Sequence, residues 1–296
     1  MDNTVLQGRI MKGVGGLYTV QTESEAYACR PRGIFRKTKE KPLVGDRVMI
    51  EVISEEEKEG SITEILPRKN RLLRPECANV DRILLLFAVH EPEPNFDMLN
   101  RYLVLMQDRE IPVVLAVTKS DLERPGDRER ILSSFKNSGL TILFISQKTG
   151  EGLEEVKRLT RGCMTALAGP SGVGKSSLLN ALLKEDVMET GNLSERIQRG
   201  KNTTRHSEIF FLGEDSFLFD TPGFTSIDIT SLKEENLSLY FPEFEAYLGQ
   251  CGFSSCRHLK EPGCRIRQAV TDGEISPDRY HAYETFYEEL KNVRRY

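Results

Sequence analysis

The segment GPSGVGKS at 169–176 limits the possible folds of this chain more than the sequence segments around it do. It fits the pattern G-x-x-x-x-G-K-S completely, follows the apolar run MTALA, and precedes the helix-like run SSLLNALLK. A loop between a strand and a helix directs successive backbone N–H groups at one place, which suits the phosphate chain of a nucleotide. The alternative, a glycine turn without a ligand, is much weaker for a complete pattern in this context.

This pattern predicts a set of nucleotide contacts. The residues are Gly169, Pro170, Ser171, Gly172, Val173, Gly174, Lys175, Ser176 and Ser177. We expect Lys175 to reach the β- and γ-phosphates and Ser176 to ligate Mg²⁺.

Two later segments are typical of the Mg²⁺ and γ-phosphate side of such a site. In FLFDTPGF, Asp220 ends an apolar run, where its carboxylate can hold Mg²⁺ through water, and the Gly223 N–H can meet the γ-phosphate. In KNTTRH, Thr204, or alternatively Thr203, offers a second hydroxyl ligand to Mg²⁺. Each segment alone is as compatible with a surface turn, but their order and spacing behind the loop favour the site.

Two segments that come earlier in the chain predict the part of the site that binds the nucleotide base. They are TKSD, which comprises Thr118, Lys119, Ser120 and Asp121, and SQK, which comprises Ser146, Gln147 and Lys148. Asp121 could accept hydrogen bonds from the N1–H and the exocyclic amine of guanine, a donor pair that adenine lacks. Lys119 would lay its aliphatic stem along the base. The backbone of 146–148 could cap the guanine O6. Thr118 stands where asparagine usually opens this tetrad, so whether its shorter side chain braces the phosphate loop is left open.

All five GTPase signals are therefore present, in the order four, five, one, two, three. This order indicates a circular permutation, because the ends of such a sheet lie near enough to be rejoined without loss of the site. The segment after Gly223 then leads directly into the C-terminal region, a short path for the nucleotide state to be transmitted.

The chain is long enough for two or three domains. Residues 1–70 contain five short β-type segments and predict an all-β OB-fold barrel, in which Val48, Ile50 and Val52 alternate as in a half-buried strand. Residues 71–225 alternate buried strands with helices and predict an α/β, circularly permuted P-loop GTPase domain. Residues 226–296 predict a small helical zinc-binding domain, with Tyr280, Tyr283, Tyr287 and Leu290 at helical spacing.

Basic residues gather in one loop of the predicted barrel, RPRGIFRKTKEKP. Six Lys and Arg side chains stand there against a single acid, Glu40, with Phe35 among them. Such a loop could grip phosphates and stack on a base, although a solvated loop is about equally compatible. The net charge of -4 argues against indiscriminate binding to nucleic acid.

The cysteines indicate a metal centre. Cys251, Cys256, His258 and Cys264 form the pattern C-x4-C-x-H-x5-C, four ligands suited to tetrahedral Zn²⁺ with no position open for catalysis. The N-terminus shows no targeting pattern, and the longest apolar run is too short to span a bilayer. We therefore expect a cytoplasmic protein without a membrane partner.

The combination resembles the RsgA (YjeQ/YloQ) family of small ribosomal subunit-dependent GTPases, and the resemblance covers essentially the whole chain. It implies an N-terminal OB-fold, a permuted GTPase and a zinc domain in this order. It also implies binding to a late-stage small subunit and its ribosomal RNA, and GTP hydrolysis stimulated by that subunit. Asn202 stands where the family commonly has histidine, so no catalytic base is assigned. Phe224 stands where many GTPases have a water-orienting glutamine, and the family shares this hydrophobic replacement.

We thus expect a monomeric GTPase that converts GTP, bound with Mg²⁺, to GDP and phosphate during late maturation of the small ribosomal subunit. One alternative is an RNA-binding assembly module whose nucleotide site serves only as a structural switch, and it would show no turnover even with subunits present. Another is an ATP-dependent enzyme, which competition with ATP would distinguish.

Overall fold

The computed structural model describes residues 4–33, 35, 40–73, 76–190, 208–213, 215–220 and 227–293. The chain folds into two compact units. One contains Met1–Leu84, Leu153–Ala168 and Lys175–Gly223, and the other contains Leu85–Gly152, Gly169–Gly174 and Phe224–Tyr296. Each unit is assembled from segments far apart in the sequence. The division at 70 and 225 stays a prediction.

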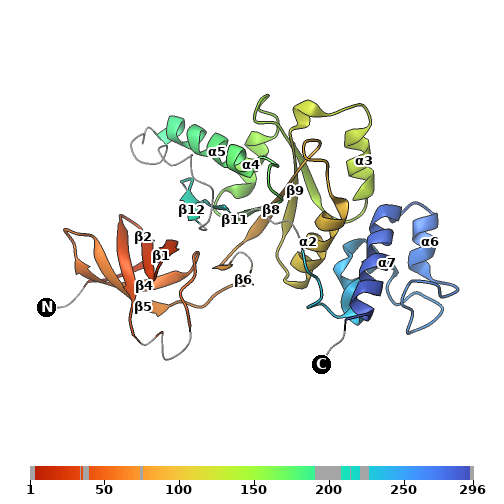
Figure 1. Ribbon diagram of the computed structural model, residues 1–296, viewed down its shortest axis with the longest axis horizontal. Helices are drawn as coiled ribbons and strands as arrows, with labels where there is room; N and C mark the ends of the chain where they lie inside the picture. The colour runs from red at the N-terminus through yellow and green to blue at the C-terminus, as the bar shows by residue number, and fades with distance from the viewer. Residues whose placement is uncertain are drawn as a thin grey trace. The chain divides into compact units, whose positions relative to one another are not determined.

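The N-terminal strands form a closed barrel (Figure 1). They are β1 (Val5–Val14), β2 (Leu17–Thr22), β3 (Ala26–Pro31), β4 (Arg47–Ser54) and β5 (Glu59–Ile65). Strand β1 pairs with β2 and β4, β3 pairs with β2 and β5, and β4 and β5 pair with each other. Every strand therefore has two neighbours, and the predicted OB-fold barrel is confirmed.

The barrel interior is built by alternation along the strands. Val48, Ile50 and Val52 are buried, as predicted, and so is Ile10 of β1. Cys29 also lies inside, where burial raises the pKa of its thiol to about 11. It therefore packs as a small apolar side chain and remains a neutral thiol at physiological pH.

The first unit continues from the barrel into α/β structure. Its elements are the ribbon β6 (Arg71–Leu73) and β7 (Glu76–Ala78), then α4 (Leu153–Thr160), β11 (Met164–Ala168), α5 (Lys175–Thr190), β12 (Glu208–Phe211) and β13 (Phe217–Asp220). Strands β11 and β13 are parallel, whereas β12 is antiparallel to β13. Strand β12 also pairs with β1 of the barrel at Lys12 and Glu208. The Arg9 guanidinium lies 4.6 Å from the centroid of the Phe217 ring and adds a cation–π contact to this junction.

The second unit contains β8 (Arg82–Ala88) from Leu85 onward. Beside it lie the parallel strands β9 (Val113–Thr118) and β10 (Thr141–Ile145), in the order β10-β9-β8. Helices α2 (Phe96–Asp108) and α3 (Asp127–Ser134) and the short helix η1 (Ser120–Leu122) accompany these strands. Leu84–Ala88 and Val114–Val117 are buried, as expected for strands covered on both faces.

The C-terminal elements of the second unit are short helices η3 (Glu234–Tyr240) and η4 (Pro242–Tyr247), followed by α6 (Arg265–Thr271) and α7 (Pro277–Lys291). Tyr283, Tyr287 and Leu290 lie on the buried face of α7, as their spacing predicts. The Tyr283 ring packs edge-on against Phe241 and Phe244, with ring centroids 5.5 and 5.1 Å apart. Aromatic side chains thus form much of the core of this helical region.

Arg279 of α7 forms a buried ion pair with Glu243 of η4 and a buried hydrogen bond with Asn100 of α2. Arg279 of α7 is 2% exposed, and its Nε donates to Glu243 at 2.6 Å while its Nη1 donates to Asn100 of α2 at 2.8 Å. Ser134 of α3 donates to Asp278 at 2.8 Å. A buried pair is costly to break, because its remaining partner is left as an uncompensated charge. The helical region is therefore fixed to α2 and α3 (Figure 1).

Within the described ranges, none of the helices is both long and apolar enough to cross a lipid bilayer.

Candidate nucleotide site and metal centre

The loop Gly169–Gly174 leads directly into α5, which begins at Lys175. Gly169 has a φ of 146°, and a Cβ there would lie 2.3 Å from the carbonyl oxygen of Leu86. A larger residue is therefore excluded by contact with β8 as well as by backbone conformation. Gly172 and Gly174 also have positive φ, so the loop adopts the conformation for which its glycines were singled out.

Thr118, at the end of β9, holds this loop in place through a hydrogen bond from its side chain. Its side chain is fully buried, and Oγ1 lies 2.6 Å from the carbonyl oxygen of Val173 and 3.2 Å from that of Phe87. A hydroxyl has one proton, so the shorter contact to Val173 is the better donor bond. The side chain is therefore long enough to brace the loop, which answers the question raised by the missing asparagine.

Asp121 and Ser146, predicted from separate motifs to share one site, are in direct contact. Ser146 is buried, and its Oγ donates to Asp121 Oδ1 at 2.7 Å. This hydrogen bond, followed by the attraction of Lys148 and Lys119, holds the pKa of Asp121 below its ordinary value. Asp121 is therefore an ionised acceptor at neutral pH, and its Oδ2 lies 3.9 Å from the Lys148 ammonium.

The two middle residues of the tetrad also have defined partners. The Lys119 ammonium donates to the carbonyl oxygen of Glu91, and the Ser120 hydroxyl donates to the carboxylate of Glu151. Lys119 itself has a left-handed φ of 58°. These bonds give the segment from Thr118 to Asp121 a single local arrangement.

Gln147 has an amide group that lacks a partner among the described residues. Its Nε2 is buried without a hydrogen bond, and it lies 3.6 Å from the position that a Cβ on Gly174 would take. A buried donor without an acceptor is costly. An oxygen of a ligand at the loop would satisfy it.

Lys175 and Asp220 face each other within the first unit. Lys175 is 9% and Asp220 5% exposed, and Asp220 Oδ1 has no hydrogen-bond partner in the described parts of the chain. Burial lowers the pKa of Lys175 and raises that of Asp220, and the attraction between the two charges opposes both shifts. An orphaned carboxylate oxygen beside a buried ammonium fits a site that takes a hydrated cation and an anion together.

The other predicted site residues divide into two groups. Pro170, Ser171, Ser176 and Ser177 lie at the surface of the loop and of the first turn of α5. Six further residues lie outside the described residues: Asn202, Thr203, Thr204, His206, Gly223 and Phe224.

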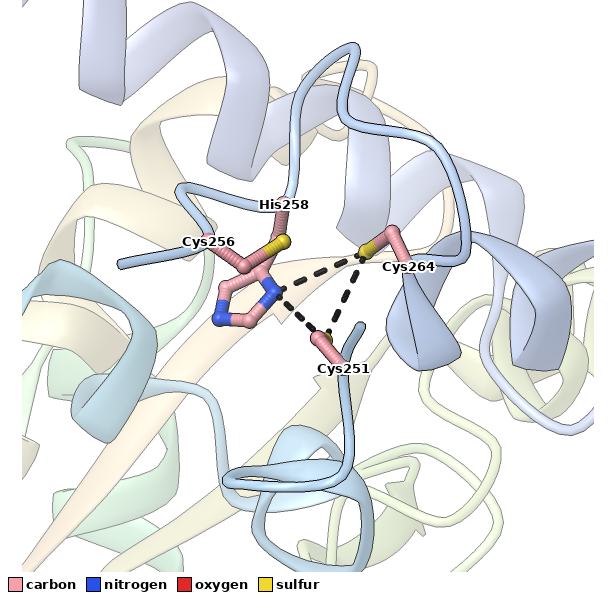
Figure 2. Close-up of side chains that lie close together, drawn as sticks. All are labelled: Cys251, Cys256, His258 and Cys264. Carbon is pink, nitrogen blue, oxygen red and sulfur yellow. Dashed lines mark hydrogen bonds between the residues drawn. The ribbon is translucent and has the colours of Figure 1, made fainter. Parts of the chain in front are cut away.

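The predicted metal ligands come together (Figure 2). The ligand atoms of Cys251, Cys256, His258 and Cys264 all lie within 4.8 Å of one another. His258 Nδ1 is 3.5 Å from Cys251 Sγ and 3.6 Å from Cys264 Sγ, and these two sulfurs are 4.0 Å apart. Tetrahedral zinc bonds of ~2.3 Å to sulfur and ~2.1 Å to nitrogen place ligand atoms roughly 3.5 to 3.8 Å apart. The cluster therefore fits a tetrahedral ion, with Nδ1 as the histidine ligand.

Residues that the sequence analysis did not connect with the metal hold its ligands in place. Tyr280 and Tyr283 of α7 donate through their hydroxyls to the carbonyls of His258 and Arg257, each at 2.7 Å. The Glu261 carboxylate accepts from three backbone N–H groups of the same loop, at 2.8 to 3.0 Å. Such supporting bonds orient ligands before a metal binds. The helical spacing of the tyrosines was visible in the sequence, but their hydrogen bonds were not.

Comparison with known proteins agrees with these features. A family model described as RsgA GTPase matches residues 65–230, and one described as RsgA N-terminal domain matches residues 7–62. The small ribosomal subunit biogenesis GTPase RsgA of Agathobacter rectalis is 44% identical, covering 98% of this chain and 100% of that protein. Its namesake from Alkaliphilus metalliredigens is 42% identical, covering 98% and 99%.

Two solved structures are similar over almost their whole length. YjeQ from Thermotoga maritima has a TM-score of 0.82 and 34% identity, covering 98% of this chain and 100% of that one. YloQ, described as a circularly permuted GTPase, has a TM-score of 0.78 and 34% identity, covering 99% and 98%.

Proposed function

The chain belongs to the RsgA GTPase family, and we propose that it hydrolyses GTP to GDP and phosphate during biogenesis of the small ribosomal subunit. The observation that carries the nucleotide assignment is the pair of bonds from Thr118 to Val173 and from Ser146 to Asp121. Together they join three motifs, distant in sequence, into one arrangement. Relatives named small ribosomal subunit biogenesis GTPase support the biological role.

For the base, we assign Asp121 to the guanine N1–H and exocyclic amine. The lowered pKa of Asp121 supports this role, since an ionised carboxylate only accepts hydrogen bonds. Lys119 covers one face of the base with its aliphatic stem. The backbone of Ser146–Lys148 caps the guanine O6, and the Gln147 amide, which has no partner among the described residues, is available to an oxygen of the nucleotide.

For the phosphates, the backbone N–H groups of Gly169 and of Ser171–Ser177 surround the phosphate chain of the nucleotide, and Lys175 neutralises charge at the β- and γ-phosphates. Ser176, and Asp220 through water, would hold the Mg²⁺ that accompanies GTP, and this ion would supply charge neutralisation during phosphoryl transfer. Thr204 and Gly223 are assigned to Mg²⁺ and the γ-phosphate from their motifs alone. Water attacks the γ-phosphorus and GDP leaves.

For the metal cluster, we propose one structural Zn²⁺. Three cysteines and one histidine suit zinc in charge and softness, and four protein ligands leave no place for a reacting water. The hydrogen bonds that Tyr280 and Tyr283 donate, and those that the Glu261 carboxylate accepts, support a site that is rigid before the ion enters.

For the ribosomal partner, we propose that the barrel contributes a surface for RNA. A hollow of about 450 Å³ is lined by Tyr18, Arg30, Arg32, Phe35 and Lys41, among others. Cationic side chains beside aromatic rings suit phosphates and unstacked bases. Arg36, Lys37 and Lys39 of the same basic loop lie outside the described residues. We expect the protein to act as a monomer in the cytoplasm, where this partner is assembled.

Guanine specificity tests the nucleotide assignment. Asp121→Asn should weaken GTP binding by at least about tenfold and favour xanthosine triphosphate, because an amide donor suits the xanthine edge. Competition of each triphosphate, and of ATP, against a fluorescent GDP analogue measures this preference. The matched control Asp97→Asn, at an exposed position on α2, should leave the preference unchanged. An unaltered preference in Asp121→Asn would remove Asp121 from the site, and equal competition by ATP would remove guanine specificity altogether.

A further inference from the structure

The segment that follows β8 lies against two parts of the proposed nucleotide site. The carbonyl oxygen of Glu91 accepts from the Lys119 ammonium. Pro92 Cδ lies 3.9 Å from the position that a Cβ on Gly172 would take. This segment therefore touches both the guanine tetrad and the phosphate loop, although none of its residues belongs to a GTPase motif.

His90 connects this segment to the start of α3 through hydrogen bonds of its imidazole ring. Its side chain is 10% exposed, and both ring nitrogens face carboxylates. Nδ1 lies 2.9 Å from Glu93 Oε1, and Nε2 lies 2.8 Å from Asp127 Oδ2 at the start of α3. Ionised carboxylates have no proton to donate, so both ring nitrogens must donate, and the ring must be an imidazolium.

The charged surroundings favour this protonated ring. The charged groups that face it are Glu93 on its own segment, Asp127 at the start of α3, and Arg124 from the residues just before that helix. The bonds to Glu93 and Asp127 hold the pKa of His90 above its ordinary value, against smaller opposing effects of desolvation and then of the Arg124 charge. The Arg124 backbone N–H, at 2.7 Å, and then His90 hold the pKa of Asp127 below its ordinary value.

We propose that His90 is a positioning residue of the nucleotide site: as an imidazolium it ties segment 90–93 to α3 and so fixes the Glu91 carbonyl that holds Lys119. Loss of either bond frees the peptide next to His90, and the Lys119 stem then has to be ordered when the base binds. Nucleotide affinity then decreases, because part of the binding free energy is used to order the Lys119 side chain. The inference rests on the proposed contact of Lys119 with guanine.

The sign of the pH effect follows from the raised pKa. Below the ordinary histidine pKa of ~6.5 the ring is charged and the segment is tied. As the pH rises through the higher pKa of the folded protein, one nitrogen loses its proton and one carboxylate loses its donor. Affinity for GDP should therefore decrease above about pH 6.5, in a step that requires His90.

Binding of a fluorescent GDP analogue between about pH 6 and pH 8.5 tests this step. His90→Gln should bind about three- to tenfold more weakly than the unaltered protein near pH 6, since the single amide nitrogen cannot take the places of both ring nitrogens. Its affinity should also lack the step. The nucleotide phosphate titrates in the same range for both proteins, so the difference between their profiles isolates His90. His281→Gln, at an exposed position on α7, is the matched control and should retain the step.

Two further measurements separate positioning from a general structural role. In subunit-stimulated turnover, His90→Gln should raise the KM for GTP about three- to tenfold with kcat nearly unchanged, because Lys119 contacts the base equally before and during reaction. Glu93→Gln changes a side chain that is 75% exposed, and should lower both the His90 pKa measured by NMR and the midpoint of the GDP step.

The inference is overturned if His90→Gln matches the unaltered protein in affinity and pH profile, or if His90 titrates at or below ~6.5. It is also overturned if Glu93→Gln leaves the midpoint in place. The proposed function fails separately, if the unaltered protein does not bind GDP at any of these pH values.

Discussion

Lys175→Ala should lower the subunit-stimulated rate of GTP hydrolysis by at least about a hundredfold, the usual effect of removing a group that stabilises transition-state charge. Lys175 is buried at the start of α5, where it interacts with the Asp220 charge, and we assign its ammonium to the phosphates. Alanine has no charge to offer the β- and γ-phosphates as negative charge moves between them. Phosphate release from GTP, with purified small subunits present, measures the rate.

The controls for this result use other positions. Ser176→Ala should abolish the stimulated rate as well, through loss of Mg²⁺, whereas Thr204→Ala should impair it with GDP binding nearly intact, because that hydroxyl serves the γ-phosphate state. Lys233→Ala removes an exposed lysine and should leave the rate unchanged. A stimulated rate that survives in Lys175→Ala would exclude this lysine from the reaction.

Cys264→Ser or Cys256→Ser should release the metal and disorder the loop that carries its ligands. Binding of structural zinc contributes on the order of 10 kcal/mol or more to the folding of small zinc domains. Cys264 is 6% exposed, and its sulfur is 3.6 Å from His258 Nδ1, so a serine hydroxyl replaces a strong ligand by a weak one. Metal analysis should find one zinc per unaltered chain and little in either variant. Subunit binding should weaken, with nucleotide binding largely retained.

The matched control for the metal is Cys163→Ser, which lies outside the cluster and should keep its zinc. Zinc retained at full occupancy in Cys264→Ser, or absent from unaltered protein purified without chelator, would contradict the ligand assignment.

Local patterns were sufficient to predict the elements and the sets of residues that meet. Alternation at Val48, Ile50 and Val52 predicted a barrel strand, because one face of each strand is buried. The C-x4-C-x-H-x5-C spacing predicted a cluster, and its ligand atoms do converge. Asp121 and Ser146 each follow a parallel strand, and neighbouring parallel strands bring such positions to one edge of a sheet.

Contacts between side chains and distant parts of the chain could not be predicted from local patterns. Whether Thr118 could replace asparagine depended on the distance to the Val173 carbonyl, which is set by the loop backbone. The pairing of Arg279 with Glu243 and Asn100 joins residues far apart in sequence. Arg279 looks like an exposed charge in a polar helix sequence, and burial of its partner is visible only after folding.

Gated catalysis is the central claim, and turnover of GTP with and without purified small subunits tests it most directly. Phe224 cannot orient a water, and the remaining candidates, Asn202, Thr203 and His206, belong to a polar and basic stretch of sequence outside the described residues. We predict slow hydrolysis by the free protein and an increase of roughly a hundredfold or more with subunits. Equal rates in the two conditions would contradict gating by the subunit, and no turnover in either would favour a nucleotide site that acts only as a structural switch.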